Sequence, residues 1–407
     1  MDRVILHCDC NSFFASVETT LNPAYRDVPM AVCGNVEDRH GIVLAKNELA
    51  KAYGIKTTDT VYQAKKLCPG LVIAEPHYDE YLRYSARVNN IYADYTDMIE
   101  PFGIDESWLD VTASGRAFGT GYKIAEEIRR RVKEEIGITV SCGVSFNKVF
   151  AKLGSDYKKP DATTVISKEN YKDIVYPLPA ADLLFVGKKT TQALIALGIR
   201  TIGELANAPS ELIVNRFGKP GEMMLKYARG EDDTPVAKSE EDTKSIGNGF
   251  TFKHDLVSRD EIKVGIMFLA EEIGRRLREK GLLCTTVSVS VKDEELRVSG
   301  RQRALSRSTD IGNDIANTAL EIISEWWSQG KPIRTITLTA LGLVRRENLG
   351  EQIDMFSDPD GELTREKKRK SEETVDKIRQ KYGRGAIVRG SVLDNKIGIF
   401  DPKTHKK

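Results

Sequence analysis

Residues 232–243 constrain the fold of this chain most, because they lack the apolar periodicity of a helix or strand and so mark a boundary between domains. They run from Asp232-Asp233-Thr234-Pro235 to Glu240-Glu241-Asp242 and are dense in charge, which is typical of a linker. The whole chain has 407 residues, too many for one ordinary hydrophobic core. We therefore expect roughly two to four domains, with one boundary at residues 232–243.

Two different patterns precede this linker. Residues 1–166 alternate short apolar runs, such as Val4–Cys8, with amphipathic helical patterns, such as Ile124–Ile136. This alternation is typical of an α/β or α+β domain. Residues 167–231 instead look all-helical and are punctuated by glycines. We expect a mixed domain followed by a small helical one.

One part of the helical segment, Leu183–Thr190, has the shape of a helix-hairpin-helix. Such a hairpin offers glycine-turn amides and a helix N-terminus to a DNA phosphate without reading the base sequence. Gly187 and Lys188 would make that contact. An ordinary helical turn is the alternative interpretation of the same residues.

After the linker, the pattern predicts the order strand, helix, strand, strand, helix, strand between Ile246 and Leu343. This β-α-β-β-α-β order is the split βαβ motif. In its first helix, Arg259–Lys280, apolar residues recur at three- or four-residue steps, so that one face would pack on a sheet. An arginine row on an exposed sheet face would track a phosphate backbone, although solvated surface residues are the alternative. The row consists of Arg297, Arg301, Arg303 and Arg307.

Composition limits the classes of protein to which this chain can belong. Lysine plus arginine (61) nearly balance aspartate plus glutamate (60), so a nucleic-acid partner must be argued from local charge. Six cysteines without a CxxC pair indicate a reducing compartment and no structural zinc. No apolar run approaches membrane-spanning length, and no signal peptide is evident. We expect a soluble, cytoplasmic monomer with no membrane partner.

Three carboxylates indicate the chemistry. Asp9 ends the apolar strand Val4–Cys10, where a side chain can face a cleft, and Asp105 and Glu106 follow as an adjacent pair much later. If the fold brings them together, they form an oxygen-only site suited to two Mg²⁺ ions, or to Mn²⁺ in their place. Such a site drives in-line displacement at phosphorus. An isolated Asp-Glu pair is otherwise an ordinary surface turn.

Lysines supply the positive charge that a triphosphate needs beyond its metal ions. The segment Ser145–Pro160 carries three of them on or beside a short helix, Lys148, Lys152 and Lys159. These lysines would suit a triphosphate or a template backbone. Lys46 and Lys51 lie in the same half of the chain. The pattern therefore predicts a nucleotidyl transferase.

Four segments together resemble the Y-family of translesion DNA polymerases, to which polymerase IV and the polymerase V catalytic subunit belong. They are the motif around Asp9, the stretch Ile104–Asp110, the segment Ser145–Pro160 and the start of the last domain, Lys244–Gly247. The resemblance covers residues 1–345 in order. It implies an α+β right-handed polymerase with a palm (1–10 and 78–166), fingers (11–77), a helical thumb (167–231), a linker (232–243), a little finger (244–345) and a tail (346–407).

The resemblance also implies roles for individual residues. Asp9, Asp105 and Glu106 would be the catalytic metal carboxylates, and the main-chain carbonyl of Cys10 would join the nucleotide-side ion. Phe14 matches the steric gate, an aromatic ring beneath the sugar that clashes with a ribose 2′-hydroxyl and favours dNTPs.

The remaining predicted nucleotide contacts follow the pattern of the family only in part. We expect Phe13 in the helix core beside the nucleotide site, and Lys159 matches a triphosphate-binding lysine. Where many polymerase IV-like members have a tyrosine and an arginine, this chain has Glu48 and Lys51. An anionic Glu48 cannot bind phosphate, so the grip would fall to Lys46 and Lys51. This pattern is nearer to the polymerase V-like branch.

The C-terminal tail resembles a tether. Gln352, Ile353, Met355 and Phe356 match the pentapeptide by which bacterial polymerases dock on the sliding β-clamp. Tethering turns each later encounter with DNA into a local one. The excess of basic residues in 357–407 suggests an added contact with DNA or a partner.

The resemblance implies template-directed addition of dNTPs to a primer 3′-hydroxyl on primer–template DNA, with low fidelity, in translesion synthesis. No second carboxylate cluster is evident, so we expect no proofreading exonuclease. Two alternatives stay open. One is a catalytically inactive polymerase-like accessory subunit that binds the clamp and repair partners, and the other is a nucleotide cyclase.

Overall fold

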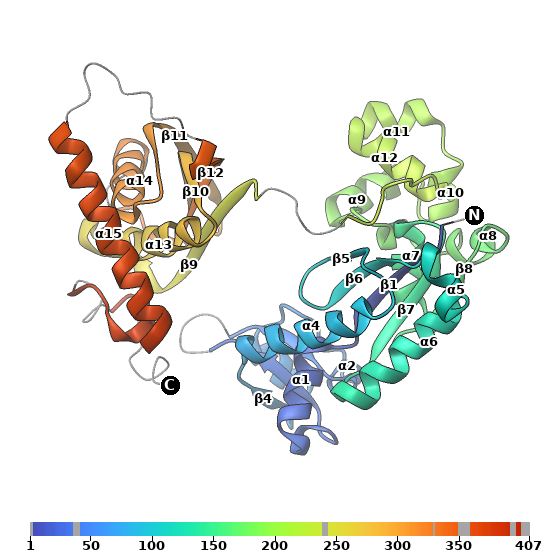
Figure 1. The fold of residues 1–407 in the computed structure, drawn as a ribbon. Coiled ribbons are helices and arrows are strands. Elements are labelled where there is room, and N and C mark those ends of the chain that lie inside the picture. Colours follow the sequence, from blue (N-terminus) through green and yellow to red (C-terminus); the bar gives the residue numbers. More distant parts are fainter. Residues whose placement is uncertain are drawn as a thin grey trace. The chain divides into compact units, whose positions relative to one another are not determined.

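The computed structural model describes residues 3–35, 41–237, 243–328, 330–348, 359–390 and 396–399. The chain folds into two compact units (Figure 1). The first contains Met1–Gly34 and Ile42–Glu241, and the second contains Asn35–Gly41 and Asp242–Lys407. None of the helices among these described residues combines the length and the apolarity needed to span a membrane.

A five-stranded sheet organises the first unit. Its strands, in spatial order, are β5 (Ile99–Pro101), β6 (Glu106–Asp110), β1 (Ile5–Cys10), β7 (Val140–Ser145) and β8 (Thr163–Ile166). Strand β1 lies at the centre, runs antiparallel to both of its neighbours, and every one of its residues is buried. A strand that is covered on both faces reads as an apolar run, which is why the sequence revealed it.

Helices cover the two faces of this sheet. The cluster around Leu6 and Cys8 of β1 includes buried residues of α1 (Phe13–Leu21), α4 (Tyr78–Ala93) and α6 (Gly121–Arg131). Since side chains alternate along a strand, Ile5, His7 and Asp9 point to the other face. There Ile5 packs with Ala151 of α7 (Lys148–Tyr157).

Glycine lets α7 approach the sheet closely. A Cβ added at Gly143 of β7 would lie 1.8 Å from the carbonyl oxygen of Ala151, so no other residue fits there without displacing the helix. This close contact brings the side chains of α7 within reach of β1 and β6.

The rest of the first unit has two parts. One is a three-stranded sheet ordered β3 (Val43–Lys46), β2 (Met30–Cys33) and β4 (Val72–Ala74), accompanied by α2 (Glu48–Ala52) and α3 (Val61–Leu67). The other is helical, as predicted, and comprises α8 (Tyr171–Val175), α9 (Lys188–Ala196), α10 (Ile202–Ala206), α11 (Ser210–Phe217) and α12 (Lys219–Ala228).

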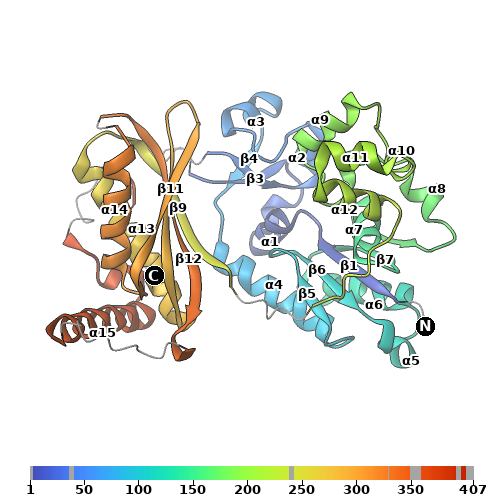
Figure 2. The same cartoon turned by 90° about the horizontal axis from the view of Figure 1, so that it is seen from above.

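The second unit confirms the predicted β-α-β-β-α-β order. Helices α13 (Arg259–Glu279) and α14 (Gly312–Trp326) lie on one face of a sheet (Figure 2). The strands, in spatial order, are β11 (Val298–Thr309), β10 (Leu282–Lys292), β12 (Ile333–Arg345) and β9 (Ser245–Leu256). The apolar stripe of the first helix is buried in this core, as its periodicity predicted.

The described part of the predicted tail packs on this second unit. Helix α15 (Pro359–Tyr382) contacts α13 through ion pairs of Arg278, a side chain only 6% exposed. Its guanidinium lies 2.6 Å from Glu372 and 2.7 Å from Asp376. Further on, Ile397 is buried in the core of the unit. These contacts join residues far apart in sequence, so the charge pattern of the tail did not reveal them.

Replacing Arg278 with alanine should lower the free energy of unfolding of the second unit by about 3–5 kcal/mol, because Glu372 and Asp376 would lose the partner of their charges. In a Trp108→Phe background the remaining tryptophans, Trp326 and Trp327, both belong to this unit. Urea unfolding followed by their fluorescence therefore measures the change.

The matched control is Lys370→Ala, which removes an exposed ion pair with Glu366 on the same helix. We expect a change within about 0.5 kcal/mol from that substitution. Equal small effects of the two substitutions would contradict the docking of α15.

Candidate active site

Strand register brings the acidic residues together. Asp9 lies opposite Glu106 in the pairing of β1 with β6. Directly opposed residues of antiparallel strands project from the same face, so these two carboxylates share a face of the sheet. The amide of Cys10 donates a hydrogen bond to the carbonyl oxygen of Asp105 at 3.0 Å, which fixes Asp105 beside the end of β1.

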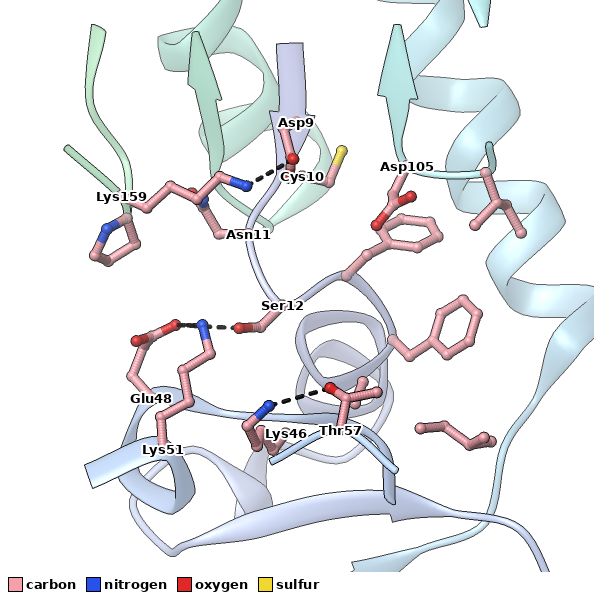
Figure 3. Close-up of a pocket in the computed structure, with 16 residues that line it drawn as sticks. Asp9, Cys10, Asn11, Ser12, Lys46, Glu48, Lys51, Thr57, Asp105 and Lys159 are labelled. Atoms are coloured by element: carbon pink, nitrogen blue, oxygen red, sulfur yellow. Dashed lines mark hydrogen bonds and ion pairs between the residues drawn. The ribbon is translucent and has the colours of Figure 1, made fainter. Parts of the chain in front are cut away.

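A cavity of about 450 Å³ opens at this end of β1 (Figure 3). Asp9, Asp105 and Lys159 line one side of it, and residues from β3 and α2 line the other. Of the residues predicted to contact nucleotide, five line the cavity, namely Phe13, Phe14, Lys46, Lys51 and Lys159. Glu106 does not line it.

Glu106 is held by side chains behind the cavity. Its carboxylate pairs with Nζ of Lys152 on α7, and one of its oxygens lies 3.1 Å from Nε2 of the fully buried His7. Burial raises the pKa of Glu106, but the contacts with His7 and Lys152 outweigh it and lower the pKa to about 2. Glu106 is therefore ionised at neutral pH.

The other two carboxylates have raised pKa values. Burial raises the pKa of Asp9, although Lys159 opposes the shift from 2.6 Å away. Burial, followed by the negative charges of Asp9 and Glu106, raises the pKa of Asp105 to about 6. Like charges that raise one another's pKa lie close together. The site therefore concentrates negative charge at the end of β1.

The donor set fits a magnesium ion. Among the described residues, no three acidic, histidine or cysteine side chains already form a metal-binding group. Asp9 and Asp105, however, present carboxylate oxygens to the same cavity as Cys10, and oxygen ligands are those that Mg²⁺ prefers. A bound cation would relieve the repulsion that raises the pKa of Asp105.

The lysines of α7 have separate partners. Nζ of Lys148 lies 2.6 Å from Glu100 and 4.5 Å from the ring centre of Trp108, and its side chain is nearly buried. The expectation that Lys148 faces a phosphate is therefore wrong, because the helix turns it toward the sheet. Lys152 binds Glu106, and of the three predicted lysines of this segment only Lys159 lines the cavity.

Lys46 and Lys51 lie on the opposite wall (Figure 3). Nζ of Lys51 lies 2.5 Å from Glu48, whose carboxylate also accepts a hydrogen bond from Ser12 at 3.1 Å. Lys46 donates to Thr57 at 3.2 Å. Burial, followed by the charge of Lys51, lowers the pKa of Lys46. Glu48 therefore holds Lys51 at the cavity.

Family models match most of this chain. The impB/mucB/samB family matches residues 8–156, and the C-terminal domain of the same family matches residues 243–355. The chain belongs to the impB/mucB/samB family.

Curated relatives and a solved structure agree with this membership. The chain is 46% identical to DNA polymerase IV of Acetivibrio thermocellus over 97% of its own length and 99% of that protein. It is 36% identical to DNA polymerase IV 1 of Bacillus subtilis, over 96% of its own length and 93% of that protein. A solved Y-family DNA polymerase chimera shares the fold, with a TM-score of 0.74 at 22% identity, and the match covers 84% of this chain and 99% of the chimera. The predicted recognition and enzyme class, a Y-family DNA polymerase, are confirmed.

The structure does not place Arg301 and Arg303 on the open sheet face that the predicted arginine row requires. Their partners across β10 are Val289 and Val287, which are buried in the core under the helices. The guanidinium of Arg301 lies 5.5 Å from the ring centre of Trp326. Arg303 forms ion pairs with two glutamates of α14, at 3.0 Å and 2.5 Å. Both arginines therefore point to the helix-covered side.

The open face of that sheet carries small polar residues instead. Alternation along the paired strands places on this face Gly247, Gly249, Ser288, Ser290, Gln302, Thr337 and Thr339. Arg297 pairs with Asp293 beyond the strand, and Arg307 is exposed on β11. The sequence shows that side chains alternate along these strands. It does not show which of the two alternating sets faces the helices.

The remaining predicted contacts lie elsewhere. Gly187 is the N-cap residue of α9 and Lys188 its first residue, so both lie at a helix start, as the hairpin interpretation requires. The clamp peptide, Gln352–Phe356, lies outside the described residues.

Sequence reasoning missed three residues of the site, namely His7, Ser155 and Tyr81. His7 shares a strand face with Asp9, so period-two alternation could have found it. Nδ1 of His7 lies 2.8 Å from Oγ of Ser155 on α7, a contact between distant segments that left no signal in the sequence. Tyr81 packs on Phe14 from α4.

Replacing Asp105 with asparagine should stabilise the metal-free protein near neutral pH. The folded-state pKa of Asp105 is raised from 3.8 to about 6, so the folded wild type binds more protons than the unfolded chain and loses stability as pH rises through this window. The asparagine variant has no titrating group at this position, so its stability does not fall in this window. Its free energy of unfolding should exceed that of the wild type by at most about 3 kcal/mol near pH 7.5.

The difference between variant and wild type should shrink toward zero as pH falls toward 4, in urea titrations with a chelator present. Asp79→Asn, at the start of α4, is the control, for which we expect little change. A destabilised Asp105→Asn protein at neutral pH would contradict the electrostatic account.

Proposed function

We propose that this Y-family polymerase adds dNTPs to a primer 3′-hydroxyl at the cavity beside Asp9 and Asp105, directed by a template strand. The observation that carries the proposal is the register of β1, which places Asp9 opposite Glu106 and Asp105 against Cys10. Two carboxylates that line a cavity together with lysines, and a third carboxylate directly behind them, suit phosphoryl chemistry.

Asp9, Asp105 and the carbonyl of Cys10 would hold Mg²⁺, with Mn²⁺ as a substitute, and Glu106 would join them on leaving Lys152. When bound, two such ions would lower the pKa of the 3′-hydroxyl and offset charge at the α-phosphate. Lys159, Lys46 and Lys51 would orient the triphosphate by their positive charge. Phe14, which lines the same cavity, would exclude a ribose 2′-hydroxyl.

The domain assignment belongs to the same proposal. The five-stranded sheet would be the palm, the three-stranded sheet the fingers, residues 167–231 the thumb, and residues 244–345 the little finger. The amides at Gly187 and Lys188 would contact the DNA backbone without base readout. Residues 352–356 would tether the enzyme to a sliding clamp. We place its role in low-fidelity synthesis across damaged templates in the cytoplasm, without proofreading.

Primer extension tests this proposal directly. With Mg²⁺ and dNTPs, the purified protein should extend a primer on undamaged and abasic templates. The Asp105→Ala/Glu106→Ala variant should lose activity by at least about 10³-fold, because it removes groups that balance charge in the transition state. Glu134→Ala, an exposed carboxylate of the same unit, is the matched control and should extend normally.

Products that do not depend on the template would overturn the proposal. So would an inactive wild type, even with a sliding clamp added, and that result would favour a non-catalytic accessory subunit.

A further inference from the structure

Glu18 is a buried carboxylate that the phosphoryl chemistry does not use. Its side chain is 3% exposed. It lies on α1, one helical turn after Phe14, and does not line the cavity. Burying a carboxylate is costly unless hydrogen bonds compensate the loss of water. Its presence there requires a set of donors.

Those donors all come from the start of α4. The hydroxyl of Tyr81 donates to Oε1 of Glu18 at 2.5 Å. The amide of His77 donates to the same oxygen at 3.2 Å, and Nδ1 of His77 lies 3.0 Å from the carboxylate. His77 is the N-cap residue of α4. Glu18 therefore ties the helix that carries Phe14 to the first turn of α4.

Tyr81 connects the hydrogen-bonded Glu18 carboxylate to the cavity. Its ring is fully buried and stacks on the ring of Phe14, with centroids 4.1 Å apart and planes inclined by 11°. Tyr78 meets both rings edge-on. Burial, followed by the hydrogen bond to Glu18, raises the pKa of Tyr81, so its hydroxyl remains a donor.

We propose that Glu18 is a positioning residue for sugar selection, which holds Tyr81 so that the Phe14 ring cannot recede from the nucleotide sugar. The inference rests on the proposed gate role of Phe14. A ring excludes a 2′-hydroxyl only if it resists displacement, because the two substrates differ by one oxygen atom. Packing surrounds the Tyr81 ring, and the hydrogen bond to a buried carboxylate fixes the position of its hydroxyl.

The experiment compares kcat/KM for a dNTP and for the matching rNTP on one primer–template. Tyr81→Phe removes the hydroxyl and keeps the stacked ring, and Glu18→Gln removes the charge and keeps the volume. Each should raise the rNTP to dNTP ratio by roughly 10-fold, near the lower end of the effect of losing one charge-assisted hydrogen bond. The double variant should raise it no further than the larger single effect, because both changes act on the same contact.

Two reference variants complete the set. Phe14→Ala should raise the ratio on the order of 10²-fold, the range that one steric contact in a pocket can supply. Glu80→Gln changes a partly exposed carboxylate of α4 that pairs with Arg83, and it should leave the ratio unchanged.

Each outcome decides the inference. If Phe14→Ala raises the ratio while Tyr81→Phe and Glu18→Gln leave it unchanged, the role of Glu18 is overturned and the gate stands. Parallel losses of kcat/KM for both substrates at a constant ratio would show a merely structural role. If Phe14→Ala leaves the ratio unchanged, the gate role of Phe14 fails and this inference fails with it, while template-directed synthesis stands. If the wild type extends nothing, the proposed function itself fails.

Discussion

The antiparallel register of β1 with β6 and β7 is the constraint on which the site depends. Because side chains alternate along a strand, a slip of one residue would turn Asp9 to the opposite face, toward the cluster that contains Cys8 and Cys10. Two kinds of contact oppose such a slip. Both faces of β1 are buried, and the Cys10–Asp105 backbone hydrogen bond fixes the end of the strand.

The same register gathers charges that repel one another. Burial, followed by this repulsion, raises the pKa of Asp105, while Lys159 and Lys152 offset the charges of Asp9 and Glu106. Such an arrangement lowers the stability of the fold, a pattern that recurs at functional centres. The buried Glu18 network differs, because hydrogen bonds satisfy its charge and its effect reaches the cavity only through aromatic rings.

Whether a feature could be predicted from the sequence depends on how far apart along the chain its interacting residues lie. The apolar run of β1, the stripe of α13 and the β-α-β-β-α-β order are local periodicities, and the structure confirms them. The orientation of Arg303 depended on which strand phase packs under α14, and the burial of Lys148 depended on Glu100. The docking of α15 depended on ion pairs nearly a hundred residues apart. Local sequence patterns carry no information about any of these three features.

A crystal structure with Mg²⁺, an incoming dNTP and a dideoxy-terminated primer on its template tests the central claim most directly. The account predicts ions about 2.0–2.1 Å from carboxylate oxygens of Asp9 and Asp105, the distance typical of Mg²⁺. It also predicts that Glu106 leaves Lys152 to join them. A triphosphate whose ions contact none of these three residues, with Glu106 still paired to Lys152, would contradict it.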